Sequence, residues 1–275
     1  MTKSAAARPG SSLVRRVAGV AGAALLAGTA AVGASGVAYS APAAAPAPPA
    51  APSVPSSVAS SVASSVASSA TDFSDCPALP EGVDPARWRC EVHTAAPKLT
   101  MGKITVALAP ITMTHAEGPL PDGGKGQVWG AMHSSPTAVP GGLTGTPAGD
   151  HAAALGLAIQ PEYGGRSDFY TGQFSLRFRL LSPLLPPGCT IGAGEPVDFQ
   201  LKRSGPSTWI SQDPPVIEFS AYDDTFTAPA AGHCGPLTGA LNRRLGLPAA
   251  EGNLMSYDAS YTFTTYDRLP AKNGG

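Results

Sequence analysis

A period-two alternation of polar and apolar residues is the feature that most constrains the fold of this chain. It recurs in short segments after residue 72, such as Ser-Leu-Arg-Phe-Arg-Leu at residues 175–180 and Val-Asp-Phe-Gln-Leu-Lys at residues 197–202. Successive side chains of a β-strand point to opposite faces, so this period predicts strands with one buried face. In residues 257–266 it places one set of side chains on a single face: Tyr257, Ala259, Tyr261, Phe263 and Thr265.

Turn signals separate the strand candidates, and Pro-Gly, Gly-Gly, Pro-Pro and Ser-Gly pairs stand between many of them. The 22 prolines after residue 71 suit such a domain, because proline is favoured at strand starts, edges and turns. The pattern predicts an all-β domain built as an antiparallel β-sandwich, with a small closed β-barrel as the alternative. The other candidate strands are residues 90–94, 104–108, 111–115, 127–132, 155–162, 216–220 and 225–227.

One short helix is predicted in the C-terminal region, at residues 235–247. Leucines recur there every four residues, at 237, 241 and 245, which gives one apolar helical face. Gly246 and Pro248 are typical of a helix end. The outer face is expected to carry Asn242, Arg243 and Arg244.

The N-terminal 71 residues contain no Asp or Glu, and their only basic residues are Lys3, Arg8, Arg15 and Arg16. An uncharged stretch rich in Ala, Gly and Val follows at residues 17–38, and small residues come next. This order predicts a secretory signal peptide over residues 1–40, with an uncleaved membrane anchor as the alternative. Once the signal is cleaved, no transmembrane anchor is expected. The predicted location is therefore extracellular or associated with the cell wall.

A low-complexity spacer is predicted at residues 41–71, where a Pro/Ala-rich stretch leads into Ser-Ser-Val-Ala repeats. Such a composition buries too little apolar surface to offset the entropy of ordering, so we expect disorder, with a weak helix as the alternative. Residues 72–270 then form a single β-domain, and residues 271–275 a flexible tail. A stalk across the cell envelope and an inert linker are equally compatible with the spacer.

Four cysteines in an exported chain predict two disulfides, for which three connectivities are possible. Pairing of neighbours in sequence is favoured, namely Cys76 with Cys90 and Cys189 with Cys234. A cysteine metal site is disfavoured because the chain has no Cys-x-x-Cys pair.

After residue 71 the chain carries 19 acidic and 14 basic residues, a net charge of −5. This excludes a nucleic-acid binder that works through a basic surface. Gly-x-Ser-x-Gly and His-Glu-x-x-His are absent, so no motif marks a serine hydrolase or a zinc protease. The five histidines (His93, His115, His133, His151 and His233) show no ligand spacing.

No catalytic residue, cofactor or metal site is predicted. Asp223 and Asp224 are weak candidates for a cation, although neighbouring acids in a turn more often cap backbone amides. Tyr257, Tyr261, Tyr266 and Phe263 form a possible ligand platform, for which core packing is the favoured explanation.

Two stretches resemble a group of secreted actinobacterial proteins of unknown function. One is Gly-Cys-Thr-Ile-Gly at residues 188–192, followed by a strand. The other runs from Phe-Thr-Ala-Pro at residues 226–229 through Cys-Gly at 234–235 to Gly-Leu-Pro-Ala-Ala-Glu-Gly-Asn at 246–253. The resemblance covers roughly residues 90–263. It implies export and a Cys189–Cys234 pair, and it brings no activity.

The favoured function is a non-catalytic binding or surface-structural module that is secreted or associated with the cell envelope. The alternative is an extracellular carrier that holds a hydrophobic ligand in a cavity between its sheets. A third possibility is a secreted hydrolase that assembles His and Asp by folding. A cell-wall component or a hydrophobic small molecule is the expected partner, and the sequence favours no particular oligomeric state.

Overall fold

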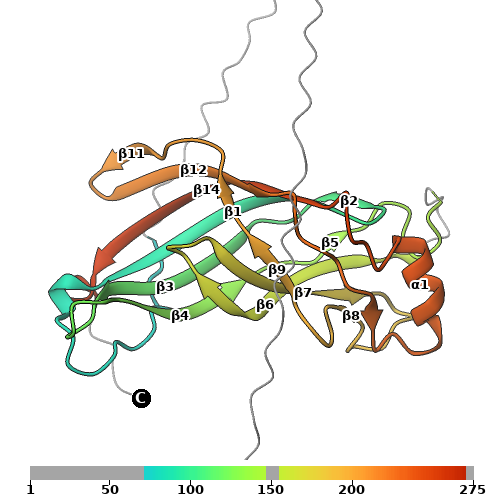
Figure 1. Ribbon diagram of the computed structural model, residues 1–275, viewed down its shortest axis with the longest axis horizontal. Coiled ribbons are helices and arrows are strands. Elements are labelled where there is room, and N and C mark those ends of the chain that lie inside the picture. Colours follow the sequence, from blue (N-terminus) through green and yellow to red (C-terminus); the bar gives the residue numbers. More distant parts are fainter. Residues whose placement is uncertain (1–70, 147–154, 271–275) are drawn as a thin grey trace, which may run out of the picture. The chain divides into compact units, whose positions relative to one another are not determined.

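The computed structural model describes residues 71–146 and 155–270. The predicted signal peptide, the spacer up to residue 70, the tail at 271–275 and His151 lie outside the described residues. The described chain is mostly antiparallel β-structure with one short α-helix near its C-terminal end (Figure 1). The fold class predicted from the alternation is thus confirmed.

The first sheet contains eight strands around a long central strand, β1 (Arg89–Met101). One edge of β1 pairs with β14 (Leu254–Thr265), and its other edge pairs first with β3 (Ile111–Pro119) and then with β2 (Ile104–Ala107). The order is β10-β12-β14-β1-β3-β4, and β11 pairs with β12. The outer members are β4 (Lys125–His133), β10 (Lys202–Arg203), β11 (Thr208–Gln212) and β12 (Pro215–Asp223).

The second sheet contains six strands in the order β13-β8-β7-β6-β5, with β9 paired to β7. No described strand of one sheet pairs with a strand of the other, so the two-sheet arrangement holds and the closed-barrel alternative does not. The strands of this second sheet are β5 (Thr137–Ala138), β6 (Ala158–Asp168), β7 (Gln173–Leu181), β8 (Thr190–Ile191), β9 (Val197–Gln200) and β13 (Ala231–Gly232).

The hydrophobic core lies between the two sheets. The first sheet contributes Leu99, Met101 and Met255, and the second contributes Ile159, Phe178 and Leu180, all of them buried. These residues occupy alternate positions of their strands, so the period in the sequence marks the face that meets the opposite sheet.

Proline 97 lies inside the central strand β1, a position that proline usually avoids because it cannot donate to a ladder. The strand pairs with β3 as far as Ala95 and with β2 from Lys98 onward. Pro97 therefore sits where one neighbouring strand ends and the next begins. Its carbonyl still accepts a hydrogen bond from the Leu108 amide at 2.8 Å.

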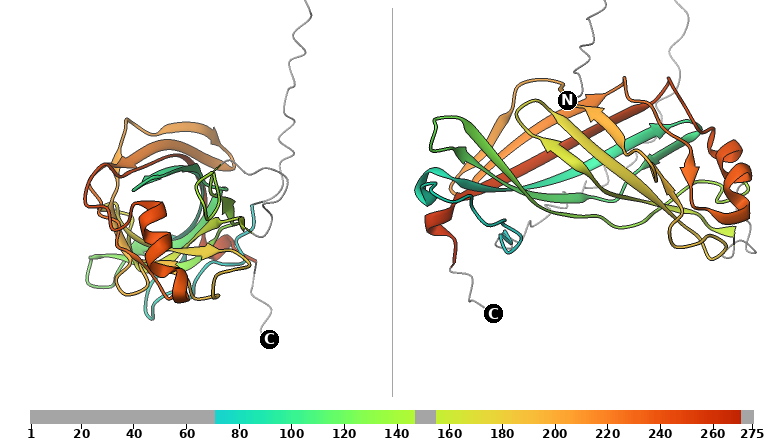
Figure 2. Two further views of the ribbon diagram at one scale, coloured as in Figure 1. Left: turned by 90° about the vertical axis from the view of Figure 1, so that its right-hand side faces the viewer. Right: turned by 60° about the horizontal axis from the view of Figure 1, so that its bottom comes forward.

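The helix α1 (Thr238–Leu245) follows a short 3-10 turn, η3 (Gly235–Leu237), and lies across one end of the sheets (Figure 2). Leu241 and Leu245 are buried, as the leucine spacing predicts. The helix ends at Gly246, whose φ of 69° is left-handed and favours glycine.

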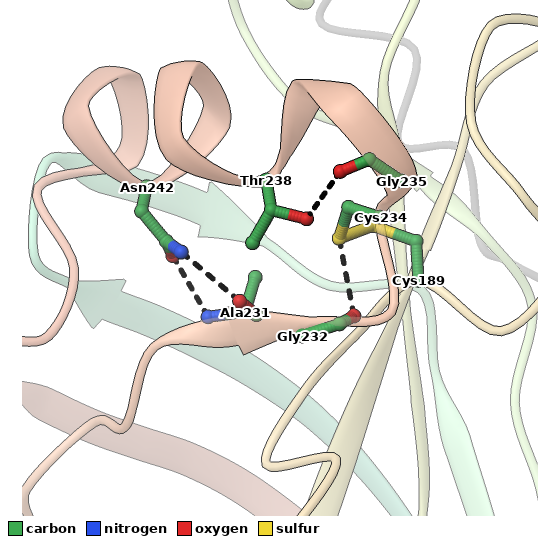
Figure 3. Close-up of a disulfide and its surroundings, with 7 residues drawn as sticks. All are labelled: Cys189, Ala231, Gly232, Cys234, Gly235, Thr238 and Asn242. Atoms are coloured by element: carbon green, nitrogen blue, oxygen red, sulfur yellow. Dashed lines mark hydrogen bonds between the residues drawn. A yellow bond between two sulfur atoms is a disulfide. The ribbon is translucent and has the colours of Figure 1, made fainter.

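One expectation about this helix is wrong. Asn242 does not lie on the outer face, because its side chain hydrogen-bonds both the backbone N–H and the carbonyl of Ala231 in β13 (Figure 3). The two contacts, at 2.8 and 3.0 Å, tie the helix to the edge of the second sheet.

Both disulfides have the predicted pairing, Cys76–Cys90 and Cys189–Cys234. The first ties the segment before β1 to the outer face of that strand, and the second joins the chain before β8 to the turn before α1 (Figure 3). In the chain-entropy model, loops of 14 and 45 residues contribute about 3 and about 4 kcal/mol to stability. Among the described residues, no helix has the length and apolar character needed to cross a bilayer.

Candidate functional site

The inner face of β1 changes character along its length. Arg89, Glu91 and His93 occupy the inward positions of its first half, while Ala95 and Leu99 continue the same face toward the α1 end. Glu91 and His93 are buried, although a sheet face that meets a second sheet normally carries apolar side chains. This polar half lies at the end of the sheets opposite α1 (Figure 1).

The neighbouring strand β3 supplies a matching polar half. In the antiparallel register, His115 lies directly opposite Glu91 and Glu117 lies opposite Arg89. Residues directly opposite each other share a face, so all these side chains meet on one side of the sheet. We call this set the polar cluster: Arg89, Glu91, His93, His115 and Glu117.

Arg89 bridges the two carboxylates of the polar cluster. Its Nε lies 2.6 Å from Glu91 Oε1, and its guanidinium donates to Glu117 Oε1. The other carboxylate oxygens face the histidines: Glu91 Oε2 lies 3.0 Å from His93 Nε2 and 3.8 Å from His115 Nε2, and Glu117 Oε2 lies 3.6 Å from His115 Nε2.

Aromatic rings fix both imidazoles. The ring of His115 is nearly parallel to that of Phe169, at 4° with centroids 3.7 Å apart, and His93 stacks on Tyr261 at 4.9 Å. The two imidazole centroids are 5.1 Å apart. Stacking restricts rotation of the rings and holds their nitrogens toward the carboxylates.

Burial dominates the electrostatics of the polar cluster. It lowers the pKa of His93 to about 3 and also lowers the pKa of His115, so both imidazoles are neutral near pH 7. Burial raises the pKa of Glu91 to about 7 against the attraction of His115 and Arg89. For Glu117 burial opposes ionisation, but His115 and Arg89 outweigh it and lower the pKa to about 2.

A cavity of about 440 Å³ lies between the two sheets and reaches the polar cluster. Its volume is within the range of small-molecule sites. Arg89, Glu91, His93 and Glu117 line one part of it. Elsewhere the lining is largely apolar and comes from both sheets, including Ala95, Ile111, Leu176, Phe199, Ala221 and Met255.

No protein family model, curated protein or solved structure matches this chain. The role of the cavity therefore follows from its shape, lining and charges alone.

The neighbouring acids Asp223 and Asp224 form local contacts in the structure. Asp223 is buried and accepts hydrogen bonds from the amides of Gln200 and Thr225 and from the Thr225 hydroxyl. Asp224 is exposed and pairs with Lys202 at 3.3 Å. The hydrogen bonds that Asp223 accepts stabilise the turn of the chain after β12. The strand expected at residues 225–227 is not formed.

The tyrosine-rich stretch divides between two roles. Tyr257 and Tyr261 point inward from β14 and line the cavity. Tyr266 lies in the turn η4 (Tyr266–Arg268), where its hydroxyl donates to the carbonyl of Pro77 at 2.8 Å. Part of the expected ligand platform is thus a cavity wall and part is packing.

Sequence spacing gives no reason to group His93 with His115, because the two lie 22 positions apart. A signal is nevertheless present: Glu91-x-His93 on one strand is mirrored by His115-x-Glu117 on another. In an antiparallel pair with the right register, such mirrored motifs share one face. Recognising them requires knowing that the two strands are neighbours.

The remaining described histidines lie apart from the polar cluster. His133 is exposed and its Nε2 lies 2.6 Å from Asp75 Oδ2, while His233 is exposed in a left-handed turn before Cys234. No described Ser, Thr or Cys side chain hydrogen-bonds His93 or His115. The described part of the site therefore lacks the hydrogen-bonded nucleophile and base of a serine-type hydrolase.

Proposed function

We propose that this protein is a non-catalytic extracellular binding protein that carries a small molecule with an apolar body and a polar end in the cavity between its sheets. The observation that carries the proposal is the cavity itself, which is mainly apolar yet ends at a buried cluster of ionisable groups. Ligand sites characteristically combine apolar walls with a few polar groups that fix orientation.

The apolar walls supply the affinity in this proposal. Burial of apolar surface contributes roughly 25 cal/mol for each Å² removed from water, so an alkyl or ring body gains several kcal/mol inside such a cavity. Ala95 and Ala221 have small side chains, which leave open space in the cavity. At the α1 end, larger apolar side chains fill the space between the sheets.

Polar and charged side chains that line the cavity orient the ligand in this proposal. Arg203 lines the cavity, is exposed, and lies over the Phe219 ring at 3.8 Å with no carboxylate pair among the described residues. Tyr170, in the turn between β6 and β7, is 45% exposed and also lines the cavity. A ligand in the cavity can place its polar end against Arg203, Tyr170 or the polar cluster.

The extracellular part of the proposal rests on two observations. Both disulfides join buried cysteines, and no described cysteine is free, which is typical of proteins from oxidising compartments. The basic and apolar N-terminal segment has the order of a secretory signal.

The proposal is tested by titrating the purified protein with Nile red, an uncharged dye whose fluorescence rises in apolar surroundings. We expect saturable binding of one dye per chain. Ala95→Phe places a ring inside the cavity and should weaken binding at least tenfold. Ala96→Phe is the matched control, because the adjacent side chain is exposed on the opposite face of β1, and it should bind like the parent.

Circular dichroism and thermal unfolding establish that both variants are folded. Ala259→Phe fills the same space from β14, since Ala259 lies directly opposite Ala95, and replaces the first variant if that one does not fold. The carrier function would be refuted if Ala95→Phe and Ala96→Phe bound Nile red equally well. It would also be refuted if the parent protein showed no saturable dye binding.

A further inference from the structure

His115 is a buried histidine whose polar atoms have no hydrogen-bond partner. Its side chain is 1% exposed, and neither Nδ1 nor Nε2 forms a hydrogen bond in the described structure. An orphaned buried polar group of this kind costs about 1–3 kcal/mol and calls for an explanation. The ring is stacked in place on Phe169, and its Nε2 lies 3.6 Å from Glu117 Oε2 and 3.8 Å from Glu91 Oε2, too far for a hydrogen bond to either.

The atoms around His115 have the identities and spacing of metal ligands. Glu91, His93 and His115 each offer one ligand atom, and these atoms lie within 4.8 Å of one another. In a tetrahedral Zn²⁺ site with bonds of 2.0–2.1 Å, ligand atoms are about 3.3 Å apart. The distances of 3.0 Å and 3.8 Å from Glu91 Oε2 to the two imidazole Nε2 atoms bracket that value.

The charges of the polar cluster also favour a cation. When both carboxyls are ionised, Glu91 and Glu117 outweigh Arg89 by one negative charge. Arg89 engages the Oε1 atoms of both carboxylates and leaves their Oε2 atoms turned to the histidines, as an outer-sphere partner does.

We propose that Glu91, His93 and His115 form a binding site for a divalent transition-metal ion of the Zn²⁺ class, with Glu117 and Arg89 as supporting residues. Two imidazoles and one carboxylate suit zinc and its neighbours better than calcium or magnesium, which prefer all-oxygen ligand sets. Three protein ligands leave a coordination position free, and Glu91 and His93 also line the cavity. The metal site borders the cavity of the proposed carrier function, but the two can be tested independently, since Zn²⁺ alone can bind whether or not the cavity takes an apolar ligand.

The test is isothermal titration of the chelator-treated, desalted full protein with Zn²⁺ alone, together with the visible absorption of the Co²⁺-loaded protein. We expect one ion per chain and an intense Co²⁺ spectrum typical of four-coordinate nitrogen and oxygen ligation. Glu91→Gln and His115→Gln should each weaken Zn²⁺ binding by more than about 100-fold. Glu117→Gln removes a supporting charge and should cost about 10–100-fold, the range for outer-sphere partners.

His133→Gln is the matched control, because it removes an exposed His–Asp pair that can bind zinc adventitiously. Its affinity and Co²⁺ spectrum should equal those of the parent. Loss of binding in His133→Gln but not in His115→Gln would show an adventitious ion only and overturn the proposal. A weak Co²⁺ spectrum typical of six-coordinate water ligation in the parent, a measurement that needs no variant to fold, would overturn it as well.

Discussion

The two ends of the first sheet use the same strands in opposite ways. Toward α1, the inward positions of β1 hold Leu99 and Met101, which share a buried core cluster with Phe178 and Leu245 and have almost no exposure. Toward the other end, the inward positions hold the polar cluster and border the cavity. The strand β1 therefore contributes apolar core residues over half its length and ionisable side chains over the other half.

Apolar side chains pack closely at the α1 end, whereas the end with the polar cluster borders a cavity. Buried ionisable groups destabilise a fold unless they are paired, and natural proteins keep such groups mainly where function requires them. The α1 end is closed by the Cys189–Cys234 disulfide and the helix α1, and its buried side chains form the apolar core.

The largest expected effect contrasts one large-to-small substitution at the two ends. Leu99→Ala should lower the free energy of unfolding by about 3 kcal/mol, because it opens a hole in a close-packed region. Met113→Ala should cost about 1 kcal/mol, since that side chain is only half-buried and already borders the cavity. Urea unfolding of both variants measures the contrast, and equal losses would mean that the cavity end is as tightly packed as the core.

Particular residues show how far the sequence predicts this fold. The alternation in residues 175–180 and 257–266 located β7 and β14 and identified their buried faces correctly, because one face of each strand meets a second sheet. Helical spacing places Asn242 on the outer face, because spacing along a helix does not reveal that an edge strand lies beside that residue. The two-residue strands β5, β8 and β13 are too short to show a period.

The polar cluster was not predictable from spacing along the chain. Its members come from two strands, and only the register of β1 against β3 brings Glu91 opposite His115. Neighbouring acids such as Asp223 and Asp224 attract attention in a sequence, yet Asp223 caps backbone amides. Burial, which sets the protonation of His93 and Glu91, is a property of the assembled sheets.

A second, smaller effect has the opposite sign. His115→Phe keeps the stacked ring on Phe169 and removes two nitrogens that form no hydrogen bond, at the loss of a 3.6 Å contact with Glu117 that is too long for a hydrogen bond. The metal-free protein should therefore gain up to about 1 kcal/mol of stability. Thermal unfolding in the presence of a chelator measures this gain. A loss of more than 1 kcal/mol would mean that the imidazole nitrogens of His115 are well satisfied in the folded protein.

A third effect, of similar size, is a pH dependence at the boundary between the two ends. Burial raises the pKa of Tyr257 from 10.0 to about 12. Because the folded-state pKa is the higher one, this contribution to stability is complete below pH 10 and is lost as the pH rises toward 12. At pH 11 the loss should be about 1 kcal/mol.

Tyr257→Phe isolates this contribution, since Tyr266 also has a pKa raised by burial to about 12 and remains in both proteins. Urea unfolding between pH 9 and pH 11 should show a shallower decline for Tyr257→Phe than for the parent. Parallel declines would place the Tyr257 hydroxyl in contact with water.

The central claim is that the space between the sheets holds an apolar ligand body. Anomalous diffraction from crystals soaked with an alkyl alcohol that carries a terminal bromine tests it most directly. We predict a bromine peak inside the cavity, beside Phe199 and Met255, with the hydroxyl end toward Arg203 or the polar cluster. Bromine peaks only on the outer surface, in crystals whose cavity is filled by protein side chains, would contradict the claim.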